Sequence, residues 1–363
     1  MRHDVTEQLE TRLSPPYLIF LGDTEDPVFA KTGAGIVQWS PELVAGQLRL
    51  TSAGIDLGVP DLTLRQAVER GVRSLVVGIA PVGGNLSPPI LDVLVEAASH
   101  GLDIVSGLHT RLTAHPALVD AADASGARLI DVRVPPPDLP IGTGVKRTGR
   151  RLLTVGTDCA VGKKYSALAI SESMQRFGVS HTFRATGQTG IMIAGSGMPI
   201  DSVVCDFLSG AAEYLSPDNE EDHWDVIEGQ GSLFNPAYAG VSLGLLHGSQ
   251  PDAIVLCHDA SRNSILNAPS VTIPSLAECL DLNIRCARLT NADATCAGVC
   301  VNSSGLPVDE RAHYLESISA ELGVPCVDPL VDGCDAIVER LVSSFSGSDR
   351  TDRTDRTDQR NTG

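Results

Sequence analysis

Short apolar runs alternate with segments of helical periodicity through the first third of the chain. The apolar runs that predict strands lie at residues 17–21, 74–80, 101–107 and 127–132. Helical patterns lie at residues 62–70, 89–100 and 116–126, each in front of one of the last three runs. Strands that alternate with helices are typical of a parallel sheet with helices on its faces. The pattern therefore predicts an α/β domain over residues 15–133.

A proline-rich segment at residues 134–140 interrupts this pattern, and the polar residues 142–150 follow it. Proline lacks a backbone donor and restricts the residue before it, so neither a strand nor a helix continues there. We predict an interdomain linker over residues 134–150.

A second α/β domain is predicted over residues 151–346. It opens with an apolar strand at residues 152–155 and closes with an amphipathic helix at residues 330–345. The other predicted strands lie at residues 181–185, 202–205, 224–227, 253–257, 283–288 and 298–302. Residues 347–363 contain a repeated Asp-Arg-Thr and no apolar pattern, so we predict a disordered tail.

The composition changes this picture mainly through its charge. The 363 residues are 42% apolar and only 4% aromatic, which suits two α/β domains. The formal net charge is −18, and the cations include only four lysines: Lys31, Lys146, Lys163 and Lys164. Dense surface carboxylate keeps a protein hydrated in concentrated salt, so the composition indicates a halophilic protein. It argues against nucleic acid as a partner, which requires a basic surface.

Other compositional features exclude several classes of protein. No apolar run approaches the roughly 18 residues of a membrane helix, and the amino terminus is charged rather than signal-like. We therefore expect a soluble, cytoplasmic protein without a membrane partner. The nine cysteines lack zinc-ligand spacing and do not indicate disulfides in such a protein, so they are interpreted as small buried residues.

A glycine-containing loop stands between the predicted strand at residues 152–155 and a helical pattern that begins at Tyr165. Where a strand, a glycine-containing loop and a helix follow one another, the backbone N–H groups of the loop can converge on a phosphate, and the helix dipole and a lysine add positive potential. The predicted phosphate-binding residues are Gly156, Thr157, Asp158, Cys159, Ala160, Val161, Gly162, Lys163, Lys164 and Tyr165. A glycine-rich turn of purely structural use is the alternative.

The loop departs from the usual P-loop at Lys164, where Ser or Thr normally completes the magnesium shell of a nucleotide. An ammonium group cannot coordinate a cation. This replacement favours a metal-free phosphate ligand such as coenzyme A over Mg-ATP or Mg-GTP, and we expect no metal.

Two further glycine-rich segments follow predicted strands. The first contains Arg184, Thr186 and Gln188, and the second contains Glu228 and Gln230. Because ligands gather at the carboxyl ends of parallel strands, Glu228 is expected to face the same crevice as the phosphate loop. We hypothesise that Lys164 takes the place of a metal and pairs with Glu228. The alternative is that the first segment is a solvated turn and that Glu228 and Lys164 are side chains in water.

Several other polar residues follow predicted strands. Asp206 either caps a helix or faces the crevice as a base. His258 and Arg262 either bind a carboxylate or phosphate or serve the structure. In the first domain, Arg133 and His109 suit an acidic ligand between the domains. The chemistry of the glycine-rich residues 31–35 and 82–84 stays open.

The ordered set GTDCAVGKKY, RATGQTG, DFLSGAAE, EGQGSL, NPAYAGVSLGLLHGS and VLCHDASR resembles one family over about residues 15–345. The family has a Rossmann-like domain followed by a P-loop domain, and its characterised members are D-glutamate N-acetyltransferases. The loop and the strand end at Glu228 also look like dethiobiotin synthetase, which has Thr in place of Lys164.

The resemblance implies acetyl transfer from acetyl-coenzyme A to the amino group of D-glutamate or a similar acidic D-amino acid, in D-amino-acid catabolism. Coenzyme A phosphates would lie on residues 156–164, and Glu228 or Asp206 would be the base. Thr186, Gln188, Gln230 or backbone N–H groups would stabilise the oxyanion. Arg184, Arg262, Arg133 or His258 would hold the substrate. We also expect a homo-oligomer.

Two other functions stay open. One is a Mg-ATP-dependent ligase of the dethiobiotin synthetase type, which magnesium dependence would reveal. The other is a non-catalytic nucleotide-binding module, which would bind a ligand without turnover.

Overall fold

The first of two parallel sheets is built by the amino-terminal part of the chain. The computed structural model describes residues 13–27, 29–80 and 86–346. Five parallel strands in the order β2-β1-β3-β4-β5 form this sheet: β1 (Tyr17–Gly22), β2 (Val44–Arg49), β3 (Ser74–Val77), β4 (Asp103–Ser106) and β5 (Leu129–Asp131). Its helical segments are α2 (Lys31–Trp39), η1 (Pro41–Leu43), α3 (Leu64–Glu69), α4 (Pro88–Ser99), η3 (Leu112–Ala114) and α5 (Pro116–Ser125).

The second sheet has six parallel strands in the order β13-β12-β9-β6-β8-β7: β6 (Arg150–Gly156), β7 (His181–Arg184), β8 (Trp224–Ile227), β9 (Ala253–Asp259), β12 (Thr295–Asn302) and β13 (Cys326–Val327). An antiparallel hairpin is formed by β10 (Ser264–Ile265) and β11 (Ala268–Thr272). The helical segments are α6 (Lys163–Arg176), α7 (Gln188–Ala194), η4 (Ile200–Ser202), η5 (Cys205–Phe207), α8 (Leu208–Leu215), α9 (Ala239–Ser249), α10 (Leu276–Ala287), α11 (Val308–Leu322) and α12 (Asp335–Ser346). The predicted α/β fold class is confirmed.

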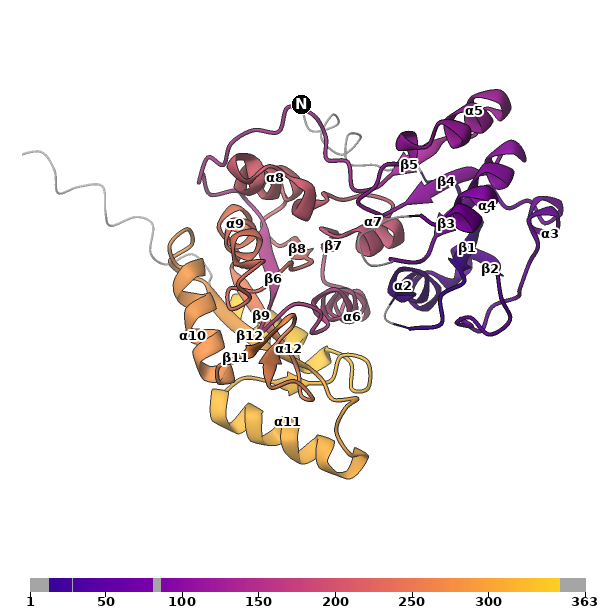
Figure 1. The fold of residues 1–363 in the computed structure, drawn as a ribbon. Helices are drawn as coiled ribbons and strands as arrows, with labels where there is room; N and C mark the ends of the chain where they lie inside the picture. The colour runs from indigo at the N-terminus through magenta and orange to yellow at the C-terminus, as the bar shows by residue number, and fades with distance from the viewer. Residues whose placement is uncertain (1–12, 28, 81–85, 347–363) are drawn as a thin grey trace, which may run out of the picture.

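The central strands are apolar because helices cover both faces of each sheet (Figure 1). All six residues of β1 and all seven of β9 are buried. Strands of this kind are near-continuous apolar runs rather than alternating ones, which is why the sequence predicts them well.

Two predicted strands are wrong. Residues 283–288 lie at the end of α10, which begins with a capping box between Ser275 and Glu278 and buries Cys279, Asn283 and Ala287 at helical spacing. Residues 202–205 join η4 to η5, and Val204 is 66% exposed there. A short apolar run does not by itself distinguish a strand from a turn or a helix.

Helix α2 was not predicted, because Gly33 and Gly35 lower the helix propensity of the glycine-rich residues 31–35. The structure shows why these glycines are there. A Cβ on Gly33 would lie 2.7 Å from Ile19 Cγ2 of β1. A Cβ on Gly35 would lie 2.8 Å from Thr189 Cγ2 of α7. Both glycines allow α2 to pack closely between the two domains.

Helix α7 joins the two halves of the molecule. It lies between the sheets beside α2 (Figure 1). Ile191 and Met192 on α7 and Ala185 before it belong to the same buried apolar cluster as the core of the first domain. The rings of Trp39 and Tyr165 stack across the contact between the two domains, with their centroids 6.2 Å apart. The two halves of the molecule are therefore joined by packed apolar and aromatic contacts.

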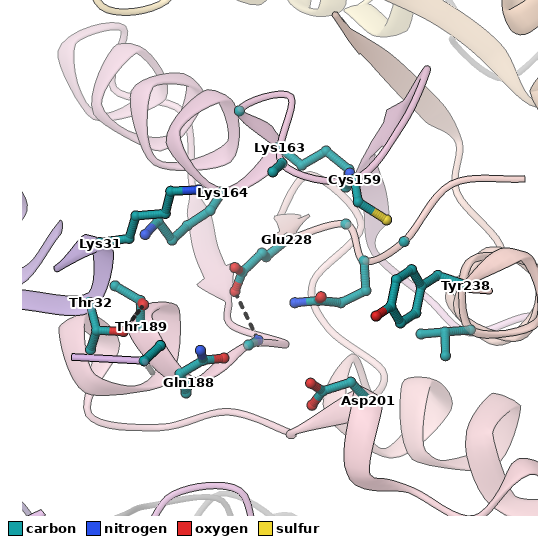
Figure 2. A pocket seen from close by; sticks show the side chains of 18 of the residues that line it. Lys31, Thr32, Cys159, Lys163, Lys164, Gln188, Thr189, Asp201, Glu228 and Tyr238 are labelled. Carbon is teal, nitrogen blue, oxygen red and sulfur yellow. Dashed lines mark hydrogen bonds between the residues drawn. The ribbon is translucent and has the colours of Figure 1, made fainter. Parts of the chain in front are cut away.

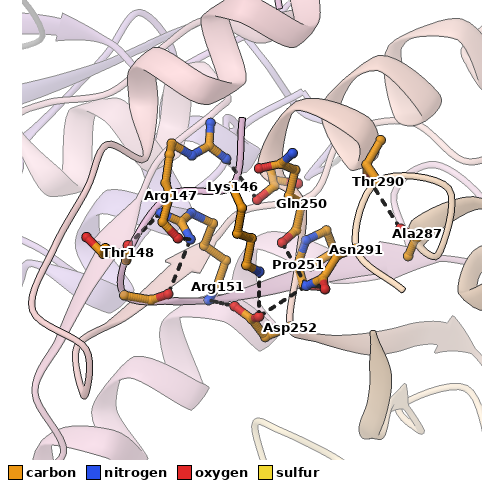
Figure 3. A network of polar contacts seen from close by, with 12 residues as sticks. Lys146, Arg147, Thr148, Arg151, Gln250, Pro251, Asp252, Ala287, Thr290 and Asn291 are labelled. Atoms are coloured by element: carbon orange, nitrogen blue, oxygen red, sulfur yellow. Dashed lines mark hydrogen bonds and ion pairs between the residues drawn. The ribbon is translucent and has the colours of Figure 1, made fainter. Parts of the chain in front are cut away.

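The predicted linker lies partly against the second domain, although its boundaries stay a prediction. Asp252, just before β9, accepts hydrogen bonds from Lys146 Nζ at 2.8 Å, the Arg151 backbone N–H at 2.8 Å and Asn291 Nδ2 at 3.1 Å (Figure 3). Earlier in the segment, Glu213 accepts from the backbone N–H of Thr143 at 2.9 Å. These bonds hold residues 143–151 against the second domain. The predicted disordered tail lies outside the described residues.

We expect Asp252→Ala to lower the free energy of unfolding by about 1–3 kcal/mol, because it removes the ion pair with Lys146 and leaves the partly buried Arg151 backbone N–H without its acceptor. Urea denaturation of the purified protein measures this loss. The control is Glu69→Ala, which removes an ion pair with Arg65 whose side chains are 88% and 61% exposed. Exposed pairs of this kind contribute less than about 1 kcal/mol, so equal losses in the two variants would contradict the structural role of Asp252.

Candidate active site

A cavity of about 710 Å³ lies between the two domains and is lined by both. The first domain contributes residues that follow the carboxyl ends of β1, β3, β4 and β5, namely Lys31, Thr32, Ala80, His109 and Arg133. The second domain contributes segments that follow β6, β7 and β8, among them residues 159–160, 162–165, 187–189 and 228–231. Ligands of α/β proteins bind outside the carboxyl ends of parallel strands. The cavity lies at these ends of both sheets and is therefore a candidate ligand-binding site.

The phosphate loop forms one wall of the cavity. It turns through positive φ angles at Ala160 (55°) and Gly162 (98°), and Gly162 precedes the first turn of α6. The buried Lys163 folds over the loop and donates a hydrogen bond from Nζ to the Asp158 carbonyl oxygen at 2.8 Å. Burial lowers the pKa of Lys163. Of the predicted phosphate-binding residues, Cys159, Ala160, Gly162, Lys163, Lys164 and Tyr165 line the cavity, whereas Gly156, Thr157, Asp158 and Val161 lie behind it.

His258 and Arg262 support the loop from behind and do not line the cavity, which agrees with the structural alternative rather than with direct ligand binding. His258 Nδ1 lies 3.1 Å from Thr157 Oγ1. Arg262 pairs with Asp158 and donates to the Cys159 carbonyl oxygen at 2.7 Å. Because β9 lies next to β6 in the sheet, side chains at its end contact the back of the loop instead of a ligand.

Glu228 lies at the end of β8 and points into the cavity beside the start of α7 (Figure 2). Its side chain is buried, and Oε2 accepts hydrogen bonds from the backbone N–H groups of Thr186 at 2.9 Å and Gly187 at 3.1 Å. Burial raises the pKa of Glu228 above the ordinary glutamate value, and the two N–H groups oppose this rise. The site thus holds a buried carboxylate whose proton affinity is increased.

Thr186 and Gln230 form a second layer around Glu228. The Thr186 hydroxyl donates to the Glu228 carbonyl oxygen at 2.7 Å and accepts from Gln230 Nε2 at 3.1 Å. Gln230 lines the cavity, whereas Thr186 is buried behind it. Thr186 therefore fixes the position of Glu228 rather than facing a ligand, which corrects its predicted role.

Lys164 lines the cavity, but the hypothesis that it pairs with Glu228 is wrong. Within the described residues, no ion pair of 4.0 Å or less joins the two side chains. Lys164 Nζ lies 4.3 Å from the centroid of the Tyr165 ring and 3.0 Å from the position of a Cβ on Gly35. The side chain extends towards α2 because glycine leaves room there. Burial lowers the pKa of Lys164 to about 8; nearby Glu228 opposes this decrease and Lys31 adds to it.

Arg133 joins the domains across the floor of the cavity. It forms an ion pair with Asp201 (Nη1 to Oδ2, 3.0 Å) and donates from Nη2 to Gln188 Oε1 at 2.9 Å. Its Nη1 also lies 2.8 Å from His109 Nε2. The structure therefore places Arg133 and His109, together with Gln188, at the cavity between the domains, where Arg133 already has a carboxylate partner.

Arg184 and Asp206 do not line the cavity, so the structure supports neither a substrate contact for Arg184 nor the base role that was one of two alternatives for Asp206. Arg184 Nε forms an ion pair with Asp225 Oδ1 at 2.8 Å, and the Asp225 side chain is only 2% exposed. Asp206 lies in η5, is exposed to solvent and belongs to the segment that does not form the predicted strand. Neighbouring residues at a strand end point in different directions, so a position near a strand end does not place a side chain in the crevice.

Several cavity residues were not assigned a role from the sequence. They include Lys31, Thr32, Asp201, Tyr238, Val241 and Leu266. The scarcity of lysine was a usable signal for Lys31, because three of the four lysines line this one cavity. No comparable signal distinguishes the others.

Comparisons with known proteins agree with this architecture. Residues 44–135 match the model of a Rossmann-like domain of unknown function, DUF1611_N, and residues 140–338 match that of a P-loop domain of unknown function, DUF1611_C. The chain belongs to the DUF1611 family. A crystal structure of a DUF1611 family protein from Anabaena variabilis has a TM-score of 0.83 and 32% identity, and the match covers 91% of this chain and all of that chain.

Two curated relatives of this DUF1611 protein carry the name D-glutamate N-acetyltransferase. The one from Tritonibacter scottomollicae is 46% identical over 331 residues, which is 91% of this chain and 99% of the relative. The one from a Pseudoalteromonas species is 46% identical over 330 residues, with the same coverage. The family predicted from the sequence motifs is confirmed. Among the helices that the structure describes, none has the length and apolar character needed to cross a membrane.

Proposed function

We propose that this protein transfers the acetyl group of acetyl-coenzyme A to the amino group of D-glutamate or a similar acidic D-amino acid. The observation that carries the proposal is the interdomain cavity, where a phosphate loop and a buried carboxylate face each other. The names of the two curated relatives support the reaction class. A catabolic role, a cytoplasmic location, adaptation to high salt and a homo-oligomeric state belong to the same proposal and rest on the sequence.

Acetyl-coenzyme A fits the phosphate-loop wall of the cavity. Lys163 and the start of α6 supply positive potential for its phosphates. Lys164 replaces the hydroxyl that would complete a magnesium shell, so the loop suits phosphates that carry no metal. On the side of Cys159, the apolar parts of Tyr238, Val241 and Leu266 offer contacts for the acyl arm.

The reaction requires an amine that has lost a proton. In the proposed mechanism, the Glu228 carboxylate takes a proton from the substrate ammonium group, and the free amine nitrogen attacks the thioester carbonyl carbon. The C–N bond forms, the C–S bond breaks, and the coenzyme A thiolate leaves. The second proton lost by nitrogen converts the thiolate to a thiol, and the first passes to solvent.

The developing oxyanion needs donors near the thioester carbonyl. Gln188 and Gln230 both line the cavity next to Glu228, and each carries an amide group. Arg133 holds Gln188 through its Oε1 atom, which leaves the Gln188 amide nitrogen on the cavity side as a candidate donor.

The deciding experiment is release of free thiol from acetyl-coenzyme A plus D-glutamate in high salt with EDTA, compared with L-glutamate and with no amino acid. Release that depends on D-glutamate supports the transferase without a metal. No release, together with magnesium-dependent ATP hydrolysis in a parallel reaction, would instead favour the ligase.

Cys159 provides a test of direct transfer. Its thiol lines the cavity, but burial raises its pKa and so reduces the thiolate needed for an acetyl-enzyme intermediate. We expect Cys159→Ala to keep turnover within about twofold, and initial rates to show sequential rather than ping-pong kinetics. Loss of turnover together with parallel double-reciprocal lines would instead indicate acetylation of Cys159.

A further inference from the structure

The cations of the cavity differ in whether they have a protein partner. Arg133 pairs with Asp201, and Lys163 donates to the Asp158 carbonyl oxygen. Within the described residues, Lys31 and Lys164 form neither an ion pair of 4.0 Å or less nor a side-chain hydrogen bond. Glu228 lies near enough to favour the charged form of Lys164 but forms no ion pair with it, and a bound anion would reduce the repulsion between the two ammonium groups.

The two lysines come from different domains and meet at the junction of α2 and α6. Lys31 is the first residue of α2, and Lys164 is the second residue of α6. Their side chains lie next to each other in Figure 2, and Lys31 contributes to the lowered pKa of Lys164. The chain has a net charge of −18 and only four lysines. Two of them in one cavity are therefore not explained by a general need for solvated charge on the surface.

The side chains of the lysine pair lie on a different side of the cavity from the phosphate loop. Consecutive helix residues point about 100° apart, so Lys164 does not follow Lys163 onto the loop. In Figure 2, Lys31 and Lys164 lie on one side of Glu228, and Cys159 and Tyr238 lie on the other. Thr32 and Thr189 also line the cavity next to the lysines, and their Oγ1 atoms are 3.2 Å apart. Glu228 therefore stands between a cationic, hydroxyl-bearing end and the end with Cys159 and Tyr238.

We propose that Lys31 and Lys164 form the subsite that binds a carboxylate of the acidic amino acid, with Lys31 supplied by the first domain. This inference rests on the proposed function. It places the substrate amine towards Glu228 and the thioester on the opposite side, as direct transfer requires. It also gives the first domain a role in substrate recognition, and it replaces the arginine clamp predicted from the sequence.

The test is Lys31→Gln, compared with Lys146→Gln. Lys146 pairs with Asp252 on the surface, and its side chain is 49% exposed. We expect Lys31→Gln to raise the KM for D-glutamate about 10- to 100-fold, the usual effect of losing a charged hydrogen bond, while the KM for acetyl-coenzyme A stays unchanged. Lys146→Gln should change neither constant. A raised KM for acetyl-coenzyme A with an unchanged KM for D-glutamate would show that the lysines bind phosphate and would overturn the proposal.

A second readout uses pH and distinguishes a charge effect from a folding defect. Lys164 is faced by Glu228, Lys31 and the Tyr165 ring, and its pKa is about 8. The wild-type kcat/KM for D-glutamate should therefore fall as pH rises through about 8, because the cation is lost. In Lys31→Gln, this alkaline limb should move to higher pH because one neighbouring cation has been removed; an unmoved limb would contradict the pairing.

Direct binding separates failure of this inference from failure of the proposed reaction. Calorimetric titration of wild-type protein and Lys31→Gln with D-glutamate needs no turnover. Weaker binding by the variant supports the subsite even if no acetyl transfer is found. Equal binding by the two proteins would overturn the subsite even if transfer is found.

Discussion

Glu228→Gln is expected to lower kcat for acetyl transfer about 10²- to 10⁴-fold, the range in which a positioned general base contributes. The amide keeps the shape of the side chain and an oxygen that can accept from the backbone N–H groups of Thr186 and Gly187. It cannot take a proton from the substrate ammonium group. Steady-state kinetics measures the loss, and calorimetric titration with acetyl-coenzyme A should show nearly unchanged affinity.

The matched control for this substitution is Asp206→Asn. Asp206 was the other base predicted from the sequence, but it is exposed and lies outside the cavity. Its variant should retain kcat within about twofold, as most surface substitutions do. If instead Asp206→Asn loses turnover and Glu228→Gln retains it, Glu228 is not the base.

The pH dependence of kcat/KM adds an independent test of Glu228. A base acts only when ionised, and burial raises the pKa of Glu228 above its usual 4.5. Activity should therefore fall as the pH drops through this raised pKa, at a higher pH than for an ordinary glutamate. Glu228→Gln should lack this acid limb.

Gly190→Ala is expected to lower kcat by about 10²-fold. The added methyl group would act by displacing Glu228 and not through a contact with the substrate. A Cβ at this position of α7 would lie 2.3 Å from Glu228 Oε2 and 3.1 Å from its Cδ. Either the carboxylate or the helix must shift, and Glu228 then loses its hydrogen bonds to the start of α7. A displacement of about 1 Å in a catalytic group can cost this factor in rate. Steady-state kinetics with both substrates checks it.

Gly240→Ala is the matched control for Gly190→Ala. Gly240 also lies in a helix, α9, but a Cβ there would have no neighbour within 4 Å. This change should leave kcat unaltered and raise the free energy of unfolding by about 0.5–1 kcal/mol, since alanine favours helix over glycine. Full turnover in Gly190→Ala, with folding intact, would show that the observed position of Glu228 is not required.

The pattern of apolar runs was sufficient to predict the class of the fold. The strands at the centre of each sheet are buried on both faces, so their sequences are continuous apolar runs that can be recognised as strands. Helix α2 was missed because its glycines serve close packing rather than local helix stability. The strand predicted at residues 283–288 failed because α10 buries only one side, at helical spacing.

The candidate site divides in the same way. The loop at residues 156–165 and the carboxylate Glu228 were predicted to face one crevice from their neighbours in the sequence, namely a strand, small residues and a helix start, and both contribute to the cavity. Ordered motifs also determined the family.

Only the tertiary structure decided which side chains reach the cavity. Arg184, His258 and Arg262 all follow or end strands, yet each contacts a carboxylate, a hydroxyl or a carbonyl group of the scaffold. Lys31 lies 133 residues before Lys164 (164 minus 31), and α2 and α6 bring them together. Local sequence specifies strands, helices and turns, because these depend on backbone preferences and burial over a few residues. The direction of a side chain at a strand end depends on how the sheets and helices pack around it, and that packing is a property of the whole fold.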